Sequence, residues 1–130
     1  MEALRHTVST DKSVDRAARD VEAALAERKF SVLWQLDVNA KLQEKGLDLR
    51  GDFRILEVCS APRAKAAIEA NPLAAYLLPC KVVVYERDGR TEIGVPRPTA
   101  LIGLLGDESL QPLADEVEAV LVEAVEAAAR

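Results

Sequence analysis

The residues best suited to chemistry in this chain are Cys59 and Cys80, its only two cysteines. A deprotonated thiol is both a nucleophile and a ligand for soft metal ions. Cys59 stands just before a predicted helix, whose N-terminal N–H groups, together with Arg63 and Lys65, favour a thiolate. Cys80 follows a helix C-terminal end, which disfavours a thiolate. We therefore predict that Cys59 is the nucleophile or metal ligand and that Cys80 is the resolving or supporting thiol.

Other side chains near the two thiols extend this candidate site. Glu57 has the same strand parity as Cys59, which places it to act as a base or as a third metal ligand. Pro62 and Pro79 flank the thiols, and Tyr85 is a further candidate for lining a pocket. The predicted ligand-binding residues are Cys59, Pro62, Pro79, Cys80, Glu57 and Tyr85, and the predicted metal ligands are Cys59 and Cys80.

The same cysteines also have a purely structural interpretation, which the sequence leaves open. Cysteine is often buried and packs as a small hydrophobe, and this pair has neither Cys-x-x-Cys spacing nor a histidine partner. The lone histidine, His6, is expected to be an ordinary strand residue, and Phe30 and Trp34 are predicted to lie in the core. Packing is likewise the simpler role for Tyr76 and Tyr85.

The composition and charge of the chain argue against several classes of function. Its 130 residues carry a net charge of -5, and its Lys and Arg residues are scattered, without the basic face that a nucleic-acid partner requires. No apolar run reaches the roughly 20 residues of a membrane helix, and the N-terminus lacks the pattern of a signal peptide. We therefore expect a cytoplasmic protein with reduced thiols and with no nucleic-acid or membrane partner.

Known cofactor and catalytic motifs are missing from the sequence. It holds no glycine-rich phosphate loop, no Ser-His-Asp set and no metal signature, so it identifies no cofactor. The scarcity of Asn, Gln and Met is typical of a thermophile, or of a GC-rich genome.

The hydrophobic patterns predict one domain, residues 1–130, of alternating strands and helices. The clearest signal is the alternation of apolar residues from Phe30 to Val38, which is typical of a strand with one buried face. Asn39 is the expected cap of a short helix that ends at Gly46, and Asp88-Gly89 predicts a tight hairpin turn. The predicted strands are 3–9, 30–38, 53–59, 80–86 and 91–95, and the predicted helices are 13–28, 39–46, 60–71, 72–78, 99–105 and a final one that begins near 107–109.

This order, β-α-β-β-β-β-α with short helical insertions, predicts an α+β fold. We expect a two-layer sandwich in which two long helices cover one face of a mainly antiparallel five-stranded sheet. Apolar residues such as Leu33, Val83 and Tyr85 point to the other face. That face either pairs with a second copy, which would make a homodimer, or is a half-polar solvated surface.

The relative position of the two cysteines depends on the segment between them. A single long helix would carry the chain to the opposite end of the sheet, a strand length of about 17 Å away. Asn71-Pro72 is expected to break that helix, because the residue before a proline avoids the helical region. Two short helices folded back on each other would place Cys59 and Cys80 side by side at one end of the sheet. We favour the second arrangement.

Several of these segments resemble a known family. The stretch Leu56-Glu57-Val58-Cys59-Ser60-Ala61-Pro62, the pair Asn71-Pro72 and the stretch Leu77-Leu78-Pro79-Cys80-Lys81-Val82-Val83-Val84-Tyr85-Glu86 are similar to the domain of unknown function 302 family. The resemblance runs from about residue 5 to residue 98. It implies a compact α+β domain with a TATA-binding-protein-like fold, often dimeric and without an established activity. Family members often carry Asn-Pro after the first cysteine position, where this chain has Ser-Ala-Pro.

These observations lead to three hypotheses about function. The first is a homodimeric binding module that holds a small molecule or a soft metal near Cys59 and Cys80, without turnover. The second is a thiol-dependent enzyme of sulfur transfer or peroxide reduction, with Cys59 as the nucleophile. The third is a structural or protein-interaction domain whose sheet face recruits a partner.

Overall fold

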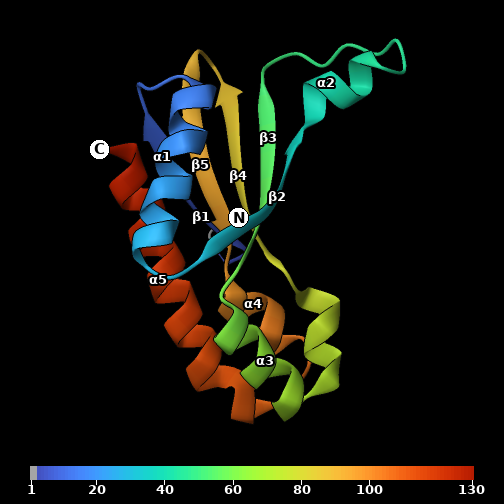
Figure 1. The fold of residues 1–130 in the computed structure, drawn as a ribbon, viewed down its shortest axis with the longest axis vertical. Helices are drawn as coiled ribbons and strands as arrows, with labels where there is room; N and C mark the ends of the chain where they lie inside the picture. The colour runs from blue at the N-terminus through green and yellow to red at the C-terminus, as the bar shows by residue number, and fades with distance from the viewer. Residues whose placement is uncertain (1–2) are drawn as a thin grey trace.

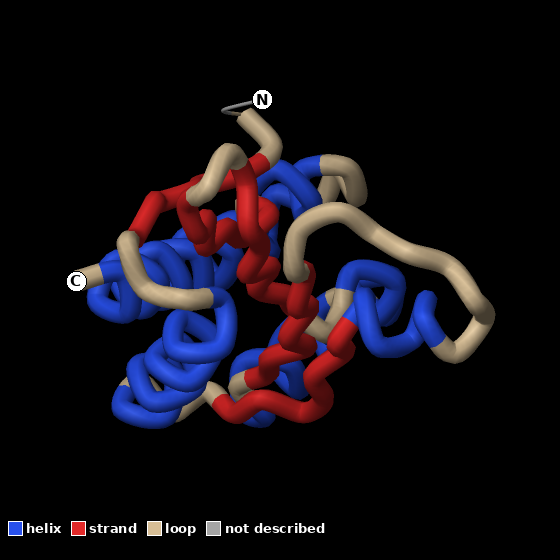
Figure 2. The backbone as a smooth tube through the Cα atoms, turned by 90° about the horizontal axis from the view of Figure 1, so that it is seen from above, coloured by secondary structure: helices blue, strands red, loops and turns tan. Residues whose placement is uncertain are grey.

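The computed structural model describes residues 3–130 and contains one antiparallel sheet with the strand order β1-β5-β4-β3-β2. The strands are β1 (Arg5–Thr10), β2 (Ser31–Asp37), β3 (Phe53–Cys59), β4 (Cys80–Arg87) and β5 (Arg90–Pro96). The two long helices, α1 (Val14–Glu27) and α5 (Gln111–Ala129), lie together against one face of this sheet (Figures 1 and 2). The α+β sandwich predicted from the sequence is therefore confirmed.

Five short helical segments complete the fold within residues 3–130. The helix α2 (Val38–Gln43) follows β2, and α3 (Ala61–Ala70) and the 3-10 helix η1 (Pro72–Leu77) join β3 to β4. The helix α4 (Pro98–Gly103) and the 3-10 turn η2 (Glu108–Leu110) join β5 to α5. In Figure 1, α3, α4 and the neighbouring η1 form a lobe below the sheet, while α2 projects from its upper end.

The core lies between the sheet and the two long helices. Alternate residues of the central strands point into it, because side chains along a strand alternate between its two faces. From β3, β4 and β5 these are Leu56, Val58, Val82, Val84, Ile93 and Val95, all fully or almost fully buried. They pack against the apolar stripes of α1 and α5, of which Val21, Leu25 and Leu121 are fully buried. Hydrophobic burial along this layer is the main stabilising contribution to the fold.

The strand β2 departs from the sequence prediction. Its pairing with β3 shifts between Val32 and Trp34, which is a β-bulge. Val32 faces Val58 on the core side, but beyond the bulge Trp34 and Leu36 pair with residues of the opposite face. The prediction that Trp34 lies in the core is thus wrong, since Trp34 is 54% exposed, whereas that of Phe30 is correct.

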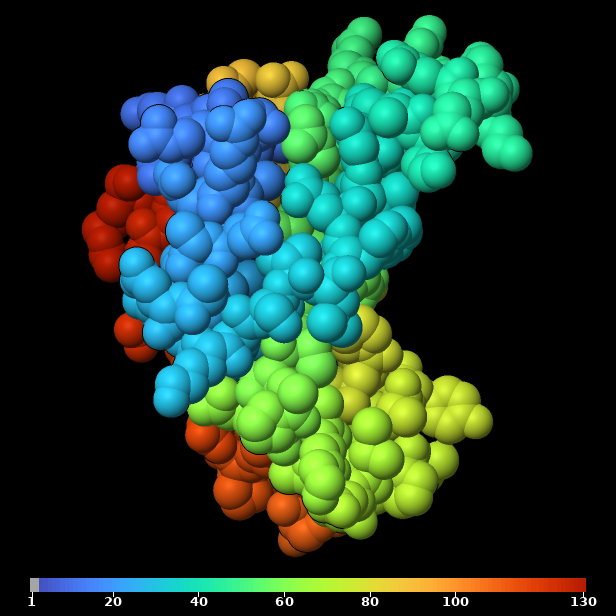
Figure 3. Space-filling model, in the orientation of Figure 1, coloured from blue at the N-terminus to red at the C-terminus, as the bar shows by residue number. Residues whose placement is uncertain are grey.

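The second face of the sheet carries an apolar patch over β2, β3 and β4, to which the bulge adds Trp34 and Leu36, and we call this patch the open face. It comprises Trp34, Leu36, Phe53, Ile55, Val83 and Tyr85. Leu36, Ile55 and Val83 stand opposite one another across three strands, and the rings of Phe53 and Tyr85 stack with centroids 5.2 Å apart. A notch beside this face separates the projecting arm, residues 38–52, from the part of the lobe formed by α3 and η1 (Figure 3).

Three smaller sequence predictions need correction. Asp37, not Asn39, caps α2, and the Asn39 side chain instead accepts from the Phe53 N–H and donates to the carbonyl of Gly51. These two hydrogen bonds join the beginning of the arm, at Asn39, to its end, at Gly51 and Phe53. Tyr76 does not pack in the interior, because it is 85% exposed on η1. The first strand begins at Arg5 instead of Ala3 and ends at Thr10.

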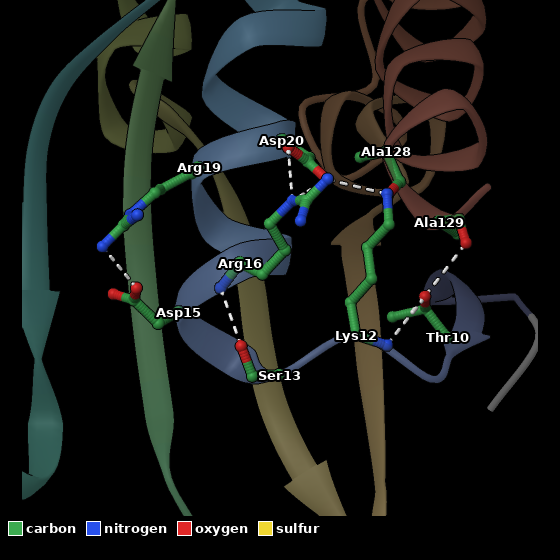
Figure 4. Close-up of polar contacts among 9 residues, drawn as sticks. All are labelled: Thr10, Lys12, Ser13, Asp15, Arg16, Arg19, Asp20, Ala128 and Ala129. Carbon is green, nitrogen blue, oxygen red and sulfur yellow. Dashed lines mark hydrogen bonds and ion pairs between the residues drawn. The ribbon is translucent and has the colours of Figure 1, made fainter.

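The turn between β1 and α1 holds the C-terminal end of α5 (Figure 4). The Lys12 ammonium donates to the carbonyl of Ala128 and to Asp20, both at 2.7 Å, and the Thr10 hydroxyl donates to the carbonyl of Ala129. The last carbonyls of a helix lack intrahelical partners and carry partial negative charge, so a cation there is stabilising. The contacts of Lys12 and Thr10 therefore fix α5 to the start of α1.

Among the helices within residues 3–130, none combines the length and the apolar character needed to cross a lipid bilayer.

The contact of Lys12 with α5 leads to a first prediction. Lys12→Met removes the ammonium but keeps the apolar stem, so it should lower the free energy of unfolding at neutral pH by about 1 kcal/mol. The hydrogen bond from Lys12 lowers the pKa of Asp20 below 3.8, so this stabilisation is present above that pH and is lost as pH falls through the folded-state pKa. Urea unfolding from neutral pH to about pH 2 should show the difference between wild type and Lys12→Met shrinking in acid.

The control is Arg16→Met, because Arg16 also contacts Asp20 but is mostly exposed. It should change the stability by less than about 0.5 kcal/mol. A deficit of Lys12→Met that is the same at neutral and acid pH would contradict the role assigned to the Asp20 pair.

Candidate functional site

The two cysteines lie next to each other at one end of the sheet. Cys59 is the last residue of β3 and Cys80 the first of β4, and in the antiparallel register Val58 faces Cys80. The helix α3 ends at Ala70 and η1 begins at Pro72, so the chain turns at Asn71-Pro72 and returns to the same end. The predicted reversal at this pair is confirmed. Both cysteines are free thiols and partly buried.

Both thiols line a cavity of about 90 Å³ between the end of the sheet and the lobe below it. Its walls come from β3, β4, α3, η1, α4 and the first turns of α5. Most of the lining side chains are apolar, among them Phe30, Leu78, Leu101, Ile102 and Val117. A cavity with such walls favours apolar molecules, because they regain there the contacts that water cannot supply.

One side of the cavity carries polar groups, which come from the first turn of α3. Ser60 occupies the N-cap position, but its hydroxyl does not cap the helix. It accepts instead from Arg63 Nη1 at 3.3 Å, and Nη2 of the same guanidinium donates to Glu116 of α5 at 3.0 Å. The guanidinium also lies over the ring of Phe30, 5.5 Å from its centroid. Arg63 thereby connects α3 to the core and to α5.

The α4 wall of the cavity is held by Glu118 of α5. Its carboxylate accepts from the backbone N–H and the hydroxyl of Thr99, at 3.1 and 2.6 Å, and pairs with Arg97 at 3.2 Å. Partial burial opposes ionisation of Glu118, but the hydrogen bonds from Thr99 and Arg97 outweigh it and lower its pKa. The carboxylate thus acts as a capping group for α4.

Other glutamates of α5 also bind neighbouring elements. Glu116 pairs with Arg63 of α3, Glu123 with Arg28 at the end of α1, and Glu126 with His6 of β1. His6 is a residue of β1 that does not line the cavity, and its Nε2 lies 3.0 Å from the carboxylate of Glu126. These contacts hold α3, the end of α1 and β1 against α5. Of these three elements, only α3 lines the cavity.

The environment of Cys80 keeps its thiol protonated. Burial, and to a lesser extent the neighbouring Cys59 and Glu57, raise the pKa of Cys80 from its ordinary 9.0 to about 11. A neutral thiol in an apolar wall behaves as a small hydrophobe and a weak hydrogen-bond donor.

The other residues of the predicted site divide between the cavity and other surfaces. Pro79 lines the cavity together with Cys59 and Cys80. Pro62 is exposed in the first turn of α3. Glu57 accepts from the Lys81 ammonium at 3.3 Å, and Tyr85 stacks on Phe53 in the open face. Within residues 3–130, no group of three His, Cys, Asp or Glu side chains is arranged to hold a metal ion.

Sequence reasoning did not find the α4 and α5 walls of the cavity. The apolar run of residues 99–105 predicts a short helix, but nothing in it indicates that Leu101 and Ile102 face the thiols. No sequence signal marks Ser60 as part of the site, because a serine at a helix start normally caps the helix, and only the structure shows that this one does not.

Comparisons with known proteins give a family and a similar structure. The family model described as "Domain of unknown function DUF302" matches residues 6–128. The chain is similar to the crystal structure of an uncharacterised conserved DUF302 protein from Bacillus stearothermophilus, with 38% sequence identity, 98% of each chain covered and a TM-score of 0.93. No curated protein matches the chain. The matched region includes α5, which lies beyond the resemblance seen in the sequence.

The second prediction concerns the reactivity of Cys80. The variant Cys59→Ser leaves Cys80 as the sole thiol, and burial, the largest cause of its raised pKa, remains in place. A shift from 9.0 to about 11 makes the thiol roughly 100-fold less ionised at neutral pH. Alkylation by iodoacetamide should therefore be slower by about that factor in the folded variant than in the same variant unfolded in urea.

The matched variant Cys80→Ser reports the rate of Cys59 under the same conditions. Equal alkylation rates for folded and unfolded Cys59→Ser would contradict the protonated, supporting thiol at position 80.

Proposed function

This chain belongs to the DUF302 family, and we propose that it is a binding module that takes a small apolar molecule into the cavity beside Cys59 and Cys80, without turnover. The observation that supports this proposal is the cavity itself, of about 90 Å³ with almost entirely apolar walls. Ligand sites are typically concave and apolar with a few placed polar groups. Ser60, Arg63 and the two thiols are such groups here.

The volume of the cavity sets the size of the ligand. An engineered apolar cavity of about 150 Å³ in another protein takes up benzene or xenon. The cavity here is smaller, at about 90 Å³, but it is not fully enclosed, so a single ring or a short aliphatic chain can enter it, either as a whole molecule or as the end of a larger one. The energy for binding comes from apolar surface removed from water, at about 25 cal/mol per Å².

The alternatives of a soft metal and of a thiol enzyme have less support. Zinc usually takes four protein ligands in a structural site, and the two thiols supply only two. Glu57, the expected third ligand or base, is paired with Lys81. A thiol enzyme needs a base beside its nucleophile, and the base expected for Cys59 is this same Glu57, which is held in the ion pair. Non-covalent binding of an apolar molecule requires neither a set of metal ligands nor a base beside a nucleophile.

The third prediction tests this function with benzene as the probe. Amide shifts in ¹⁵N-labelled protein should respond to benzene in α3, α4 and the start of α5. The variant Ala114→Leu should abolish the response, because Ala114 is buried in the cavity wall and the larger side chain fills it. Ala23→Leu, which adds the same volume on the exposed side of α1, should bind benzene as wild type does.

Benzene shifts that are absent from wild type, or unchanged in Ala114→Leu, would refute the proposal. Calorimetry with Zn²⁺ and Cu⁺ separates the metal alternative. Stoichiometric uptake that is lost in Cys59→Ser and in Cys80→Ser would support a soft-metal site instead.

We also infer that the chain forms a homodimer through the open face. Trp34 is more than half exposed there, next to Leu36, Ile55 and Val83, and exposed apolar patches of this kind mark interaction surfaces. A two-fold axis lets one patch meet its own copy, so a single apolar face suffices for both partners. The notch between the arm and the lobe gives this face a concave outline that a second copy of the chain can enter (Figure 3).

The fourth prediction tests this dimer by sedimentation equilibrium. Wild type should sediment as a dimer and Trp34→Glu as a folded monomer, because a charge buried in the interface without a partner is costly. Tyr76→Glu is the control, since Tyr76 is also aromatic, is more exposed than Trp34 and lies outside the open face. A wild type that sediments as a monomer, or a Tyr76→Glu variant that dissociates while Trp34→Glu does not, would overturn the dimer.

A further inference from the structure

The arm is an ordered element whose apolar side chains its own chain leaves uncovered. Local hydrogen bonds shape it, since Gly46 has a positive φ and the Leu47 N–H donates to the carbonyl of Leu42, which closes α2. Yet no residue of α2 is buried, and beyond the helix Leu47 is 56% and Leu49 38% exposed. A helix of six residues has little stability by itself and depends on apolar contacts. The structure of residues 3–130 supplies no buried contact for it.

The arm rises above one end of the open face. Figures 1 and 2 show it on the side of the sheet away from α1 and α5, which is the side of the open face. At the other end of the strands, η1 projects on the same side (Figure 1). The open face is therefore the floor of the notch, with the arm and the lobe as its walls (Figure 3). A flat surface cannot reach such a floor, whereas a projecting element can.

Charged groups beside the floor and on the arm are complementary. Glu92 of β5 lies opposite Tyr85 of the open face, is partly buried and accepts from the Ser9 hydroxyl at 2.9 Å. In the part of the chain that the structure describes, no cation pairs with Glu92, and no carboxylate pairs with Lys45 or Arg50 of the arm. A carboxylate partly withdrawn from water is stabilised by a nearby cation. An arm that enters a notch brings such a cation to Glu92.

We propose that the two copies of the dimer exchange their arms, so that the arm of each copy enters the notch of its partner. Leu47 and Leu49 then cover the open face of the partner, and a cation of the arm pairs with Glu92. A two-fold axis forms this contact twice, because each copy offers one arm and one notch. The inference rests on the homodimer proposed above, to which it adds the element that each copy contributes and the surface that receives it.

The charge of the arm favours a second copy as the occupant of the notch. The chain has a net charge of -5, so two copies repel each other over most of their surfaces. The arm itself is neutral, because its three basic residues balance its three acidic ones: Lys41, Lys45 and Arg50 against Glu44, Asp48 and Asp52. A contact between arm and notch therefore avoids the repulsion that other surfaces of the chain would produce.

The direct test places the photoreactive residue p-benzoylphenylalanine at position 48, which keeps both leucines of the arm. Irradiation should give a covalent dimer, and mass spectrometry should locate the new bond in β2, β3 or β4. A mixture of ¹⁵N-labelled and unlabelled protein distinguishes bonds between copies from bonds within one chain. The control places the same residue at position 22, where Glu22 is also acidic and exposed but lies on α1. It should give no covalent dimer.

Variants of the arm measure its contribution in sedimentation equilibrium. Leu47→Glu and Leu49→Glu should each raise the dissociation constant of the dimer about 100-fold, because each places an unpaired charge in an apolar notch. Glu92→Gln should raise it by a smaller factor, about fivefold. The control is Leu104→Glu, since Leu104 is strongly exposed and belongs to neither the arm, the open face nor η1. It should dimerise as wild type does.

The outcomes separate the arm exchange from the dimer itself. If wild type is a dimer that Trp34→Glu dissociates, while Leu47→Glu and Leu49→Glu leave it intact, the exchange is wrong and the open-face dimer stands. Bonds from position 48 that reach only the partner's arm, or only the same chain, would also overturn the exchange. If wild type is a monomer, both fail. Should Leu47→Glu not fold by circular dichroism, Leu49→Glu and the photoreactive residue decide.

Discussion

The antiparallel pairing of β3 with β4 is the constraint on which the site depends. Because Val58 faces Cys80, the segment of residues 60–79 must leave and re-enter the sheet at the same end. Its two helical pieces cannot extend along the sheet as a crossover would, so they fold into a lobe beyond its edge. The space between that lobe and the strand ends is where the cavity lies. The thiols of Cys59 and Cys80 line it as a consequence of the register.

The lobe is held in place by charged contacts to α5. A short helix such as α3 or α4 has little stability of its own and relies on tertiary contacts. Arg63 with Glu116 fixes α3, and Thr99 and Arg97 with Glu118 fix α4. The acidic residues of α5 thus serve as attachment points in addition to facing solvent. At the far end of the same helix, Lys12 and Thr10 bind its last carbonyls, so both ends of α5 are fixed to other elements.

The division of roles between the two sides of the sheet follows from one β-bulge. Before it, β2 directs Val32 to the core, and after it Trp34 and Leu36 lie on the open face. Trp34 and Leu36 are not part of the core, which contains the fully buried Leu25, Leu56 and Leu121. Trp34 and Leu36 therefore belong to an outer surface of the protein. The proposed dimer would use this surface, and the proposed ligand would use the cavity at the end of the sheet.

Local signals in the sequence were enough to predict the order of strands and helices and the turn at Asn71-Pro72. Proline restricts the backbone before it whatever the tertiary context, so that break could be predicted with its consequence for Cys59 and Cys80. The bulge in β2 could not, because an alternating pattern carries no mark of the residue at which its parity changes. The cavity wall from α4 also escaped prediction, since it depends on contacts between residues far apart in sequence.

A crystal of the chain exposed to xenon under pressure tests the account most directly. Xenon enters apolar cavities without needing a polar partner, so it reports on the cavity independently of any ligand chemistry. The account predicts a xenon site between Cys80 and Leu101, and its absence from a crystal of Ala114→Leu. A crystal in which xenon occupies only other places, or in which side chains of the lobe fill the space beside the thiols, would contradict it.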